Sequence, residues 1–495
     1  MAEQKKNKHR ANENIIENTE LSIWEALLPV VVLVAMLAYN VFVFGDGALD
    51  GSNQFILLLG GAVAAVVGFF NKVSYKQMMA EVAENVKSTT GALLILLMVG
   101  ALSGTWLISG IIPSMIYYGL QILNPTIFLA ACVVICAIIS VATGSSWTTS
   151  ATVGIALIGI GDALGISLGM TAGAVLSGAY FGDKLSPLSD TTNLAPAMAG
   201  GELFSHIKYM TLTTIPTIVV TFLVFVILGF TIDTSGTADT EAILTSLKKG
   251  FHITPWLFLV PVAVIFMIVK KAPPLLALLI GTLLGGVFAL IFQPAVVSAT
   301  GGGESLDFIS GYKGILNAIT VETIIPTENE NLVKLFKAKG MYGMLGTIWL
   351  IICAMVFGGI MDGIGALSRI TKSLLGMAKT TFGLFASTVG SCLALNITAS
   401  DQYLAIVVPG KMFSKAYADR GLAPENLSRT LEDSGTVTSV LIPWNTCGAY
   451  HSGVLGVSVL DYMLFAIFNW LSPIMTLIFA GFGIKIKQLT TLKTN

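Results

Sequence analysis

The chain has 495 residues, of which 54% are hydrophobic and only 11% charged, and its formal net charge is −1. Soluble proteins carry about 25% charged residues, so this composition excludes an ordinary soluble domain, and the balanced charge excludes a basic surface for nucleic acid. Apolar windows of about 20 residues recur along the chain, whereas a β-barrel shows alternating strands of roughly 10 residues. We therefore expect an all-α polytopic membrane protein.

The apolar segments predict roughly ten full membrane spans and several interrupted ones. The polar segments 74–88 and 202–210 predict helices that lie on the membrane interface, and 231–253 and 293–340 read as polar connectors. In chain order, the apolar segments are 24–45, 54–71, 89–110, 126–142, 151–181, 211–230, 255–270, 273–292, 342–366, 382–395, 402–410, 431–450 and 455–482.

The placement of charge predicts the orientation. The N-terminal tail, 1–23, is polar and rich in lysine near its start, and Lys72, Lys76 and Lys87 follow the second span. The first span and its loop, 24–53, contain the acidic stretch GDGALDGSN, and the C-terminal tail, 483–495, carries lysines. Because basic residues gather on the cytoplasmic side, both termini are expected there. No cleavable signal segment is expected, since the first apolar run is long enough to span.

The chain reads as two halves of similar plan, 54–254 and 255–482, with the connector 293–340 inside the second. In each half a glycine-rich span precedes a helix that ends in hydroxyl side chains, and a second polar break follows later. Two halves that are interrupted at matching places are typical of a secondary transporter built from inverted repeats. The matched stretches are 98–110 with 355–367, 142–152 with 394–402, and 182–193 with 432–445.

The polar breaks are the candidate ion site. In hydrocarbon every backbone amide must be paired, so a break is tolerated only where it is buried or lines a wet cavity. Freed carbonyls, hydroxyls and carboxylates are also the ligands that hard cations prefer. The candidate ligands are Asp183, Asp190, Asp401, Asp433, Thr143, Ser145, Ser146, Thr148, Thr191, Asn193, Asn396, Thr398, Ser400, Ser434 and Thr436.

Among these carboxylates, Asp190 and Asp433 are expected to meet Na⁺ directly. A charge inside an apolar segment costs about 2.5–3.5 kcal/mol and marks ion paths. The spacing of the halves pairs Asp433 with either Asp183 or Asp190, and we prefer Asp190 because the sequence DTTN surrounds it with oxygens. Lys184 and Arg429 each stand near an acid, so they are expected to form ion pairs or to bind an organic anion. Glu432 is the expected acidic neighbour of Arg429.

An enzyme is not expected. The sequence contains no HExxH, no GxSxG and no P-loop, and only four histidines. The five cysteines lie in or beside apolar segments without a second metal-binding pair, so they read as packing residues. We expect no cofactor and no resident metal beyond transported ions.

Two motifs carry a family resemblance. GSSWTTSATVG (144–154) and GAYFGDKLSPLSDTTNLAP (178–196) resemble the NhaC family of bacterial sodium/proton antiporters, and the resemblance extends over roughly residues 20–480. It implies two inverted repeats, each with a re-entrant hairpin and a broken helix, and a homodimer in which a transport domain moves against a scaffold as an elevator. The hairpin tips would lie at 144–148 and 396–400, and the broken helices at 182–196 and 432–446.

The expected function is exchange of Na⁺ for H⁺ across the bacterial inner membrane. Burial favours the protonated form of a carboxyl group and bound Na⁺ favours the ionised form, so the two cations compete for one site. The same family includes malate–lactate antiporters coupled to Na⁺ and H⁺, which is the alternative. Carboxylates outnumber cations at the breaks, and this favours a bare cation over a diacid.

Overall fold

The computed structural model describes residues 15–44, 47–48, 51–231, 240–327, 333 and 336–489. Its long apolar helices are α2 (Ile23–Phe44), α3 (Ser52–Phe70), α4 (Tyr75–Ile108), α6 (Pro125–Thr143), α11 (Leu203–Thr231), α14 (Pro274–Phe292), α17 (Leu345–Gly363) and α19 (Thr381–Thr398). Shorter helices connect and interrupt them. They are α5 (Ile111–Ile122), α7 (Ser146–Thr149), α8 (Ile155–Ala163), α9 (Leu168–Leu185), α10 (Asp190–Ala199), α12 (Thr240–Gly250), α13 (Leu259–Val269), α15 (Pro294–Thr300), α16 (Phe308–Thr320), α18 (Ala366–Gly376), α20 (Leu404–Asp419), α21 (Pro424–Leu431), α22 (Thr446–Leu455), α23 (Val459–Tyr462) and α24 (Ile467–Gly481).

Short 3₁₀ and π-helical turns are the remaining helical elements of the described structure. The 3₁₀ turns are η3 (Pro255–Phe258), η5 (Tyr342–Met344) and η7 (Ser439–Leu441), and the π-helical turns are η2 (Ser150–Gly154) and η6 (Glu432–Thr436). Two short strands, β1 (Thr323–Ile324) and β2 (Lys337–Ala338), pair antiparallel. The predicted helical class is confirmed, with this small sheet as a local exception inside the expected connector 293–340.

The number of full spans is lower than the sequence suggested. Within the described residues, eight helices are long and apolar enough to cross a membrane, or nine if the bent pair Glu241–Gly250 and Pro255–Val269 is one span. The expectation of about ten full spans was wrong because several apolar runs are divided. For example, the run 455–482 contains α23 and α24.

Two segments predicted as separate interfacial helices belong to longer helices. Residues 74–88 form the cap and the first turns of α4, where the Ser74 side chain accepts a hydrogen bond from the Gln77 amide. Residues 203–210 begin α11, which continues to Thr231. Polar sequence at a span end does not by itself stop a helix, because neither segment contains a proline or a glycine that would break it.

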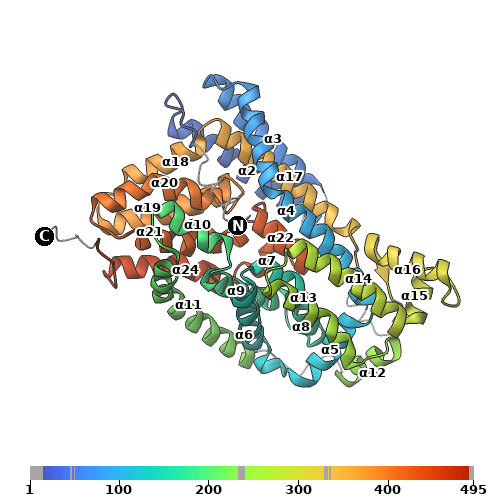
Figure 1. Ribbon diagram of the computed structural model, residues 1–495. Coiled ribbons are helices and arrows are strands. Elements are labelled where there is room, and N and C mark those ends of the chain that lie inside the picture. Colours follow the sequence, from blue (N-terminus) through green and yellow to red (C-terminus); the bar gives the residue numbers. More distant parts are fainter. Residues whose placement is uncertain are drawn as a thin grey trace.

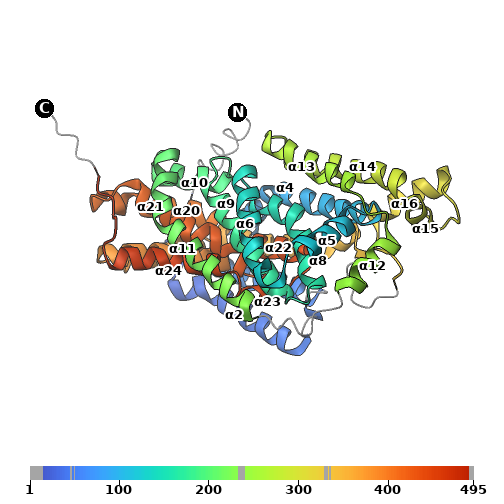
Figure 2. The ribbon, with the colours of Figure 1, turned by 90° about the horizontal axis from the view of Figure 1, so that it is seen from below.

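The long helices form one elongated body (Figure 1). α4 packs against α14 and α17, and α3 packs against α17. The helices α18–α21 and α24 lie at one end, and α12, α15 and α16 lie at the other, as both ribbon views show (Figure 2). The short helices α7 and α22, which border the chain's interruptions, lie near the middle of the body (Figure 1).

Glycines allow the closest helix contacts. A Cβ at Gly178 or Gly182 in α9 would lie 2.2 Å or 2.5 Å from the carbonyl oxygens of Val133 and Ala137 in α6. Such contacts are shorter than any real Cβ makes, so α6 and α9 can pack backbone to backbone only with glycine there. This packing holds the end of α9, with Asp183 and Lys184, beside the end of α6.

Candidate ion-binding site

The first broken helix is the junction between α9 and α10. α9 ends at Leu185, and α10 begins at Asp190 after the stretch SPLS. The Ser189 side chain accepts a hydrogen bond from the Thr192 amide and so caps α10, and the Thr192 hydroxyl donates to the Lys184 carbonyl at 3.0 Å. Pro187 and the capping serine therefore explain why the helix stops and restarts here.

The tip of the first hairpin contacts this break. The chain leaves α6 through Gly144, at φ 70°, and a Cβ there would meet Leu188 Cβ at 2.5 Å. The Ser146 amide and hydroxyl both donate to Asp183 Oδ2, at 3.0 Å and 2.7 Å. Asp183 is buried, and its other oxygen, Oδ1, has no hydrogen-bond partner in the described structure. An ionised carboxylate with one free buried oxygen is suited to meet a cation.

The tip of the second hairpin contacts the second break in the same manner. The Asn396 side chain donates to the Gly435 carbonyl at 2.8 Å and to the Thr438 hydroxyl at 3.0 Å. The Thr446 amide donates to the Ser400 carbonyl at 2.9 Å. Ser400 has φ 58°, a conformation that non-glycine residues seldom adopt and that often marks functional sites.

The two halves also contact each other at these points. Trp147, at the first tip, stacks on Tyr450 of α22 with ring centroids 3.9 Å apart, and the Tyr450 hydroxyl donates to the Trp147 carbonyl at 3.2 Å. The segments 144–148 and 396–400 and the two helix interruptions, which are far apart in the sequence, are therefore linked by contacts in the interior.

An ion pair joins the two broken helices. The Lys184 ammonium in α9 contacts Asp433 Oδ1 in η6, and both side chains are fully buried. Asp433 Oδ2 accepts hydrogen bonds from the hydroxyls of Thr213 in α11, at 2.8 Å, and Thr476 in α24. Both carboxylate oxygens of Asp433 are thus satisfied by protein groups, including a full positive charge.

Two further buried charges lie beside this pair without a hydrogen bond among the described residues. Neither carboxylate oxygen of Glu432 and none of the three guanidinium nitrogens of Arg429 has a partner. The Arg429 guanidinium instead lies 4.5 Å from the ring centroid of Tyr209 and 5.9 Å from that of Phe479. The expected Glu432–Arg429 ion pair is therefore not formed in the described structure.

Asp190 and Asp401 lie apart from the buried pair. Asp190 begins α10 and is exposed, and its oxygens accept from the Thr191 amide and from the Tyr403 hydroxyl. Asp401 is buried and accepts from the amides of Tyr403 and Leu404 at the start of α20. Asp401 and Tyr403 line a cavity of about 270 Å³ together with residues from α4 and α17 and from the N-terminal segment, namely Glu81, Glu84, Asn85, Asp362 and Ile16.

The remaining candidates divide into two groups. One group makes local hydrogen bonds: Ser145 caps α7, Asn193 donates to the Ser189 and Pro187 carbonyls, and Thr143, Thr191 and Ser434 bond to oxygens within four residues. In the other group, the buried hydroxyls of Thr398, Ser400 and Thr436 lack a partner in the described structure. Thr148 is buried, and its carbonyl accepts from Thr152. The second group has oxygens available to a ligand.

Sequence reasoning did not identify Thr213 and Thr476 as site residues, and it left Glu432 out of the candidate ligands. The two threonines lie inside long apolar helices, where hydroxyls commonly bond back to their own helix. A usable signal was their similar setting, since each lies three residues from a proline within its helix, Pro216 or Pro473.

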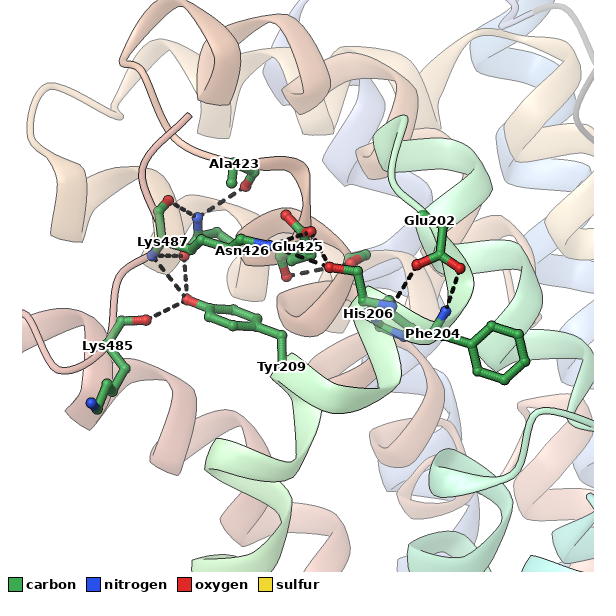
Figure 3. A network of polar contacts seen from close by, with 11 residues as sticks. Glu202, Phe204, His206, Tyr209, Ala423, Glu425, Asn426, Lys485 and Lys487 are labelled. Atoms are coloured by element: carbon green, nitrogen blue, oxygen red, sulfur yellow. Dashed lines mark hydrogen bonds and ion pairs between the residues drawn. The ribbon is translucent and has the colours of Figure 1, made fainter. Parts of the chain in front are cut away.

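The C-terminal segment, α11 and the start of α21 are joined by a second network of polar contacts (Figure 3). The Tyr209 hydroxyl oxygen lies 2.6 Å from both Asn426 Oδ1 and the Lys485 carbonyl oxygen, and its single hydrogen is donated to one of these two acceptors. Lys487 Nζ pairs with Glu425 Oε1 at 2.6 Å, and the Asn426 side chain donates to the Lys487 carbonyl. These contacts fix α11, α21 and the C-terminal segment together beside the Tyr209 ring, which covers the Arg429 guanidinium.

Comparisons with known proteins identify the family. A model described as the Na⁺/H⁺ antiporter family matches residues 178–484. The Na⁺/H⁺ antiporter NhaC of Alkalihalophilus pseudofirmus is 36% identical over 466 residues, which cover 94% of this chain and 97% of that protein. The NhaC of Bacillus subtilis is 34% identical over 406 residues, covering 82% and 86%, and the malate-2H⁺/Na⁺-lactate antiporter of the same organism is 35% identical over 461 residues, covering 92% of both. The chain therefore belongs to the Na⁺/H⁺ antiporter family.

Proposed function

We propose that the chain is a secondary transporter of the cell membrane that exchanges Na⁺ for H⁺. Family membership supports the reaction, and NhaC relatives carry that activity in their names. The observation that carries the proposal is the buried Asp183 carboxylate, which is held by Ser146 on one oxygen and has no partner on the other within the described residues.

The count of buried charges supports a monovalent cation as the cargo. Asp183, Glu432 and Asp433 are buried in this cluster; Lys184 pairs with Asp433, whereas Arg429 forms an ion pair with none of the three carboxylates in the described structure. A surplus carboxylate can be neutralised by either Na⁺ or H⁺. Because the two loads neutralise the same charge, they exclude each other, and exchange follows if only loaded forms cross the membrane.

In this proposal Asp183, rather than Asp190 or Asp433, meets the transported Na⁺. Asp433 is occupied by Lys184 and two threonines, and Asp190 is exposed. The tip of the first hairpin supplies the neutral groups around Asp183, since Ser146 touches that carboxylate directly. Na⁺ accepts hydroxyl and carbonyl oxygens, so a single carboxylate with neutral oxygens is a suitable ligand set.

We further propose two inverted repeats, with a transport domain that moves against a scaffold. The order of elements supports this division. α4 and α5 meet at Gly110, φ 78°, and α17 and α18 meet at Gly365, φ 80°; a hairpin and a broken helix follow each pair. α3, α4, α14 and α17 would form the scaffold, and the hairpins with α9–α11 and α21–α24 the moving part. A homodimer with cytoplasmic termini completes the proposal.

A second candidate reaction is organic-acid exchange, as in the name of the malate–lactate relative. Arg429 favours it, because a buried guanidinium without a hydrogen bond could receive a carboxylate. The guanidinium lies over the Tyr209 ring, however, 4.5 Å from its centroid, so the ring covers one face of the group that would receive the carboxylate.

The test is Na⁺-driven proton movement in proteoliposomes, with and without malate or lactate. Asp183→Asn should abolish exchange, whereas Asp190→Asn and Asp419→Asn, at the exposed end of α20, should retain it. Exchange that requires the organic acid would replace the first proposal with the second. Unchanged exchange in Asp183→Asn would overturn the assignment of the site.

A further inference from the structure

Glu432 is the buried acid that the proposed exchange does not yet use. It is the first residue of the π-helical turn η6, it has no exposed surface, and neither of its carboxylate oxygens has a hydrogen-bond partner within the described structure. An ionised carboxylate cannot persist in such a place alone, because desolvation is not offset by any partner. Glu432 must therefore be neutralised by something that is not part of the chain's hydrogen-bond network.

The neighbouring charges do not supply this neutralisation. The charged groups that act on Glu432 are Lys184 and Asp183 from α9 and Asp433 on its own turn. Lys184 is already committed to Asp433, and the other two are acids. From the packed helix α19 the titratable neighbour is Cys392, which carries no positive charge. Arg429, three residues before Glu432, is the remaining buried cation, and its guanidinium lies over the Tyr209 ring without a hydrogen bond to Glu432 in the described structure.

The π-helical turn η6 carries a second buried side-chain oxygen group without a hydrogen-bond partner in the described structure. The Thr436 hydroxyl, four residues further along the same π-helical turn, is buried and also lacks a partner among the described residues. π-helical turns are rare and appear frequently at functional sites, because their wider spacing leaves backbone groups unpaired. A carboxylate and a neutral hydroxyl on one turn are both oxygen ligands of the kind that small hard cations bind.

Glu432 also has the same relation to the central ion pair as Asp183 has. Asp183 immediately precedes Lys184, and Glu432 immediately precedes Asp433, across a separation of 249 residues in both cases. Each of the two acids retains an unpartnered oxygen in the described structure. The ion pair between them is thus flanked by two carboxylates that have capacity for a ligand.

We propose that Glu432 is a second cation-binding site, so that each transport cycle loads two carboxylates, Asp183 and Glu432, rather than one. This inference rests on the proposed Na⁺/H⁺ exchange at Asp183. The second cation is either a proton, in which case one Na⁺ shared by the two carboxylates replaces two protons, or a second Na⁺. The two cases differ in the number of protons exchanged per Na⁺ and in the Hill coefficient for Na⁺ binding.

The first measurement uses the unmodified protein, purified in detergent in weakly buffered solution. Saturating Na⁺ should release about two protons per chain, and release of one proton would overturn the proposal. Titration with ²²Na⁺ then distinguishes the two cases, because one or two Na⁺ ions bind per chain. No proton release at all would instead contradict the underlying Na⁺/H⁺ exchange.

The second measurement compares variants in proteoliposomes. Glu432→Gln should either lower the H⁺/Na⁺ ratio from two to one or lower the Hill coefficient for Na⁺ from two to one, while Glu432→Asp, which keeps the carboxylate, should preserve both values. Glu432→Gln that is active with both quantities unchanged would overturn the proposal. Asp183→Asn serves as the comparison, because it should abolish exchange altogether.

Discussion

At the scale of single residues, the Lys184–Asp433 pair shows why a buried ion pair must be judged as a unit. Both side chains are fully buried, and Asp433 has a full set of partners. Removing one member leaves the other charge buried alone, which typically costs 3–5 kcal/mol, whereas replacing both by apolar residues of similar volume is often neutral.

We therefore predict opposite results for single and double substitutions of this pair. Lys184→Met should lower the stability of the purified protein by about 3–5 kcal/mol, because Asp433 loses its counter-charge. Lys184→Met combined with Asp433→Leu should recover most of that loss. Thermal unfolding in detergent measures both. Equal destabilisation in the single and double variants would contradict the coupling.

A second residue-scale prediction concerns Ser146. Its hydroxyl donates to Asp183 Oδ2 at 2.7 Å, and a hydrogen bond to a charged group contributes about 1.5–3 kcal/mol. Ser146→Ala removes a group that favours the ionised carboxylate, so protons should compete more strongly. We expect the apparent KM for Na⁺ to rise about tenfold or more. Ser145→Ala, which loses only a helix cap, is the matched control and should change KM much less.

The burial of Asp183 and the exposure of Asp190 could not be predicted from the sequence. DTTN provides many oxygens near Asp190, but the structure directs those oxygens into capping and turn contacts, and Asp190 faces the surface. Asp183 looked neutralised by its neighbour Lys184, yet adjacent helical residues point in different directions. Lys184 instead reaches a carboxylate 249 residues away.

At the scale of elements, the hairpin tips are fitted closely to the long helices. A Cβ at Gly358 of α17 would lie 2.2 Å from the Ala399 carbonyl at the second tip. A side chain there must displace backbone, and overpacking of this kind typically costs 1–3 kcal/mol.

We predict that Gly358→Ala reduces the exchange rate in proteoliposomes, because the second tip can no longer seat against α17. Gly390→Ala is the control, since a Cβ at Gly390, one helix away in α19, meets nothing within 4 Å. Similar rates for the two variants would show that close seating of the tip is not required for transport.

The elements that could be predicted from sequence are those with local causes. Pro187, the capping residue Ser189 and the left-handed Gly144 stop or start helices through their own backbone preferences. The divided run 455–482 and the joined helices α4 and α11 were misjudged because hydropathy does not record where a helix bends or continues. The strand pair β1–β2 is too short to leave a periodic pattern.

At the scale of the whole molecule, the burial of the chain's own cysteines allows its orientation in the membrane to be measured with introduced cysteines. All five are buried, at positions 132, 136, 353, 392 and 447. A membrane-impermeant maleimide should therefore label the unmodified protein weakly, and introduced cysteines should dominate the signal.

We predict that Lys76→Cys, at an exposed position of α4, is labelled only after the membrane is permeabilised, because lysine-rich segments lie in the cytoplasm. Asp50→Cys, in the acidic stretch between the first two apolar segments, should be labelled in intact cells. Labelling of Lys76→Cys in intact cells would reverse the proposed orientation.

Contacts between the halves could not be predicted from the sequence. The stacking of Trp147 on Tyr450 and the convergence of Thr213 and Thr476 on Asp433 join segments far apart in the chain. Local sequence patterns predict where helices begin and end within each half, but they do not predict which residues of the two halves contact each other.

The central ion pair has a consequence for how such a chain could have arisen. If the halves are repeats and Asp433 corresponds to Asp183, the residue that corresponds to Lys184 is Ser434. An ancestor assembled from two identical half-length chains would then form the lysine–aspartate pair twice, once on each side of its two-fold axis. This chain keeps the pair on one side only, so the divergence of the halves leaves Asp183 without the lysine that symmetry would supply.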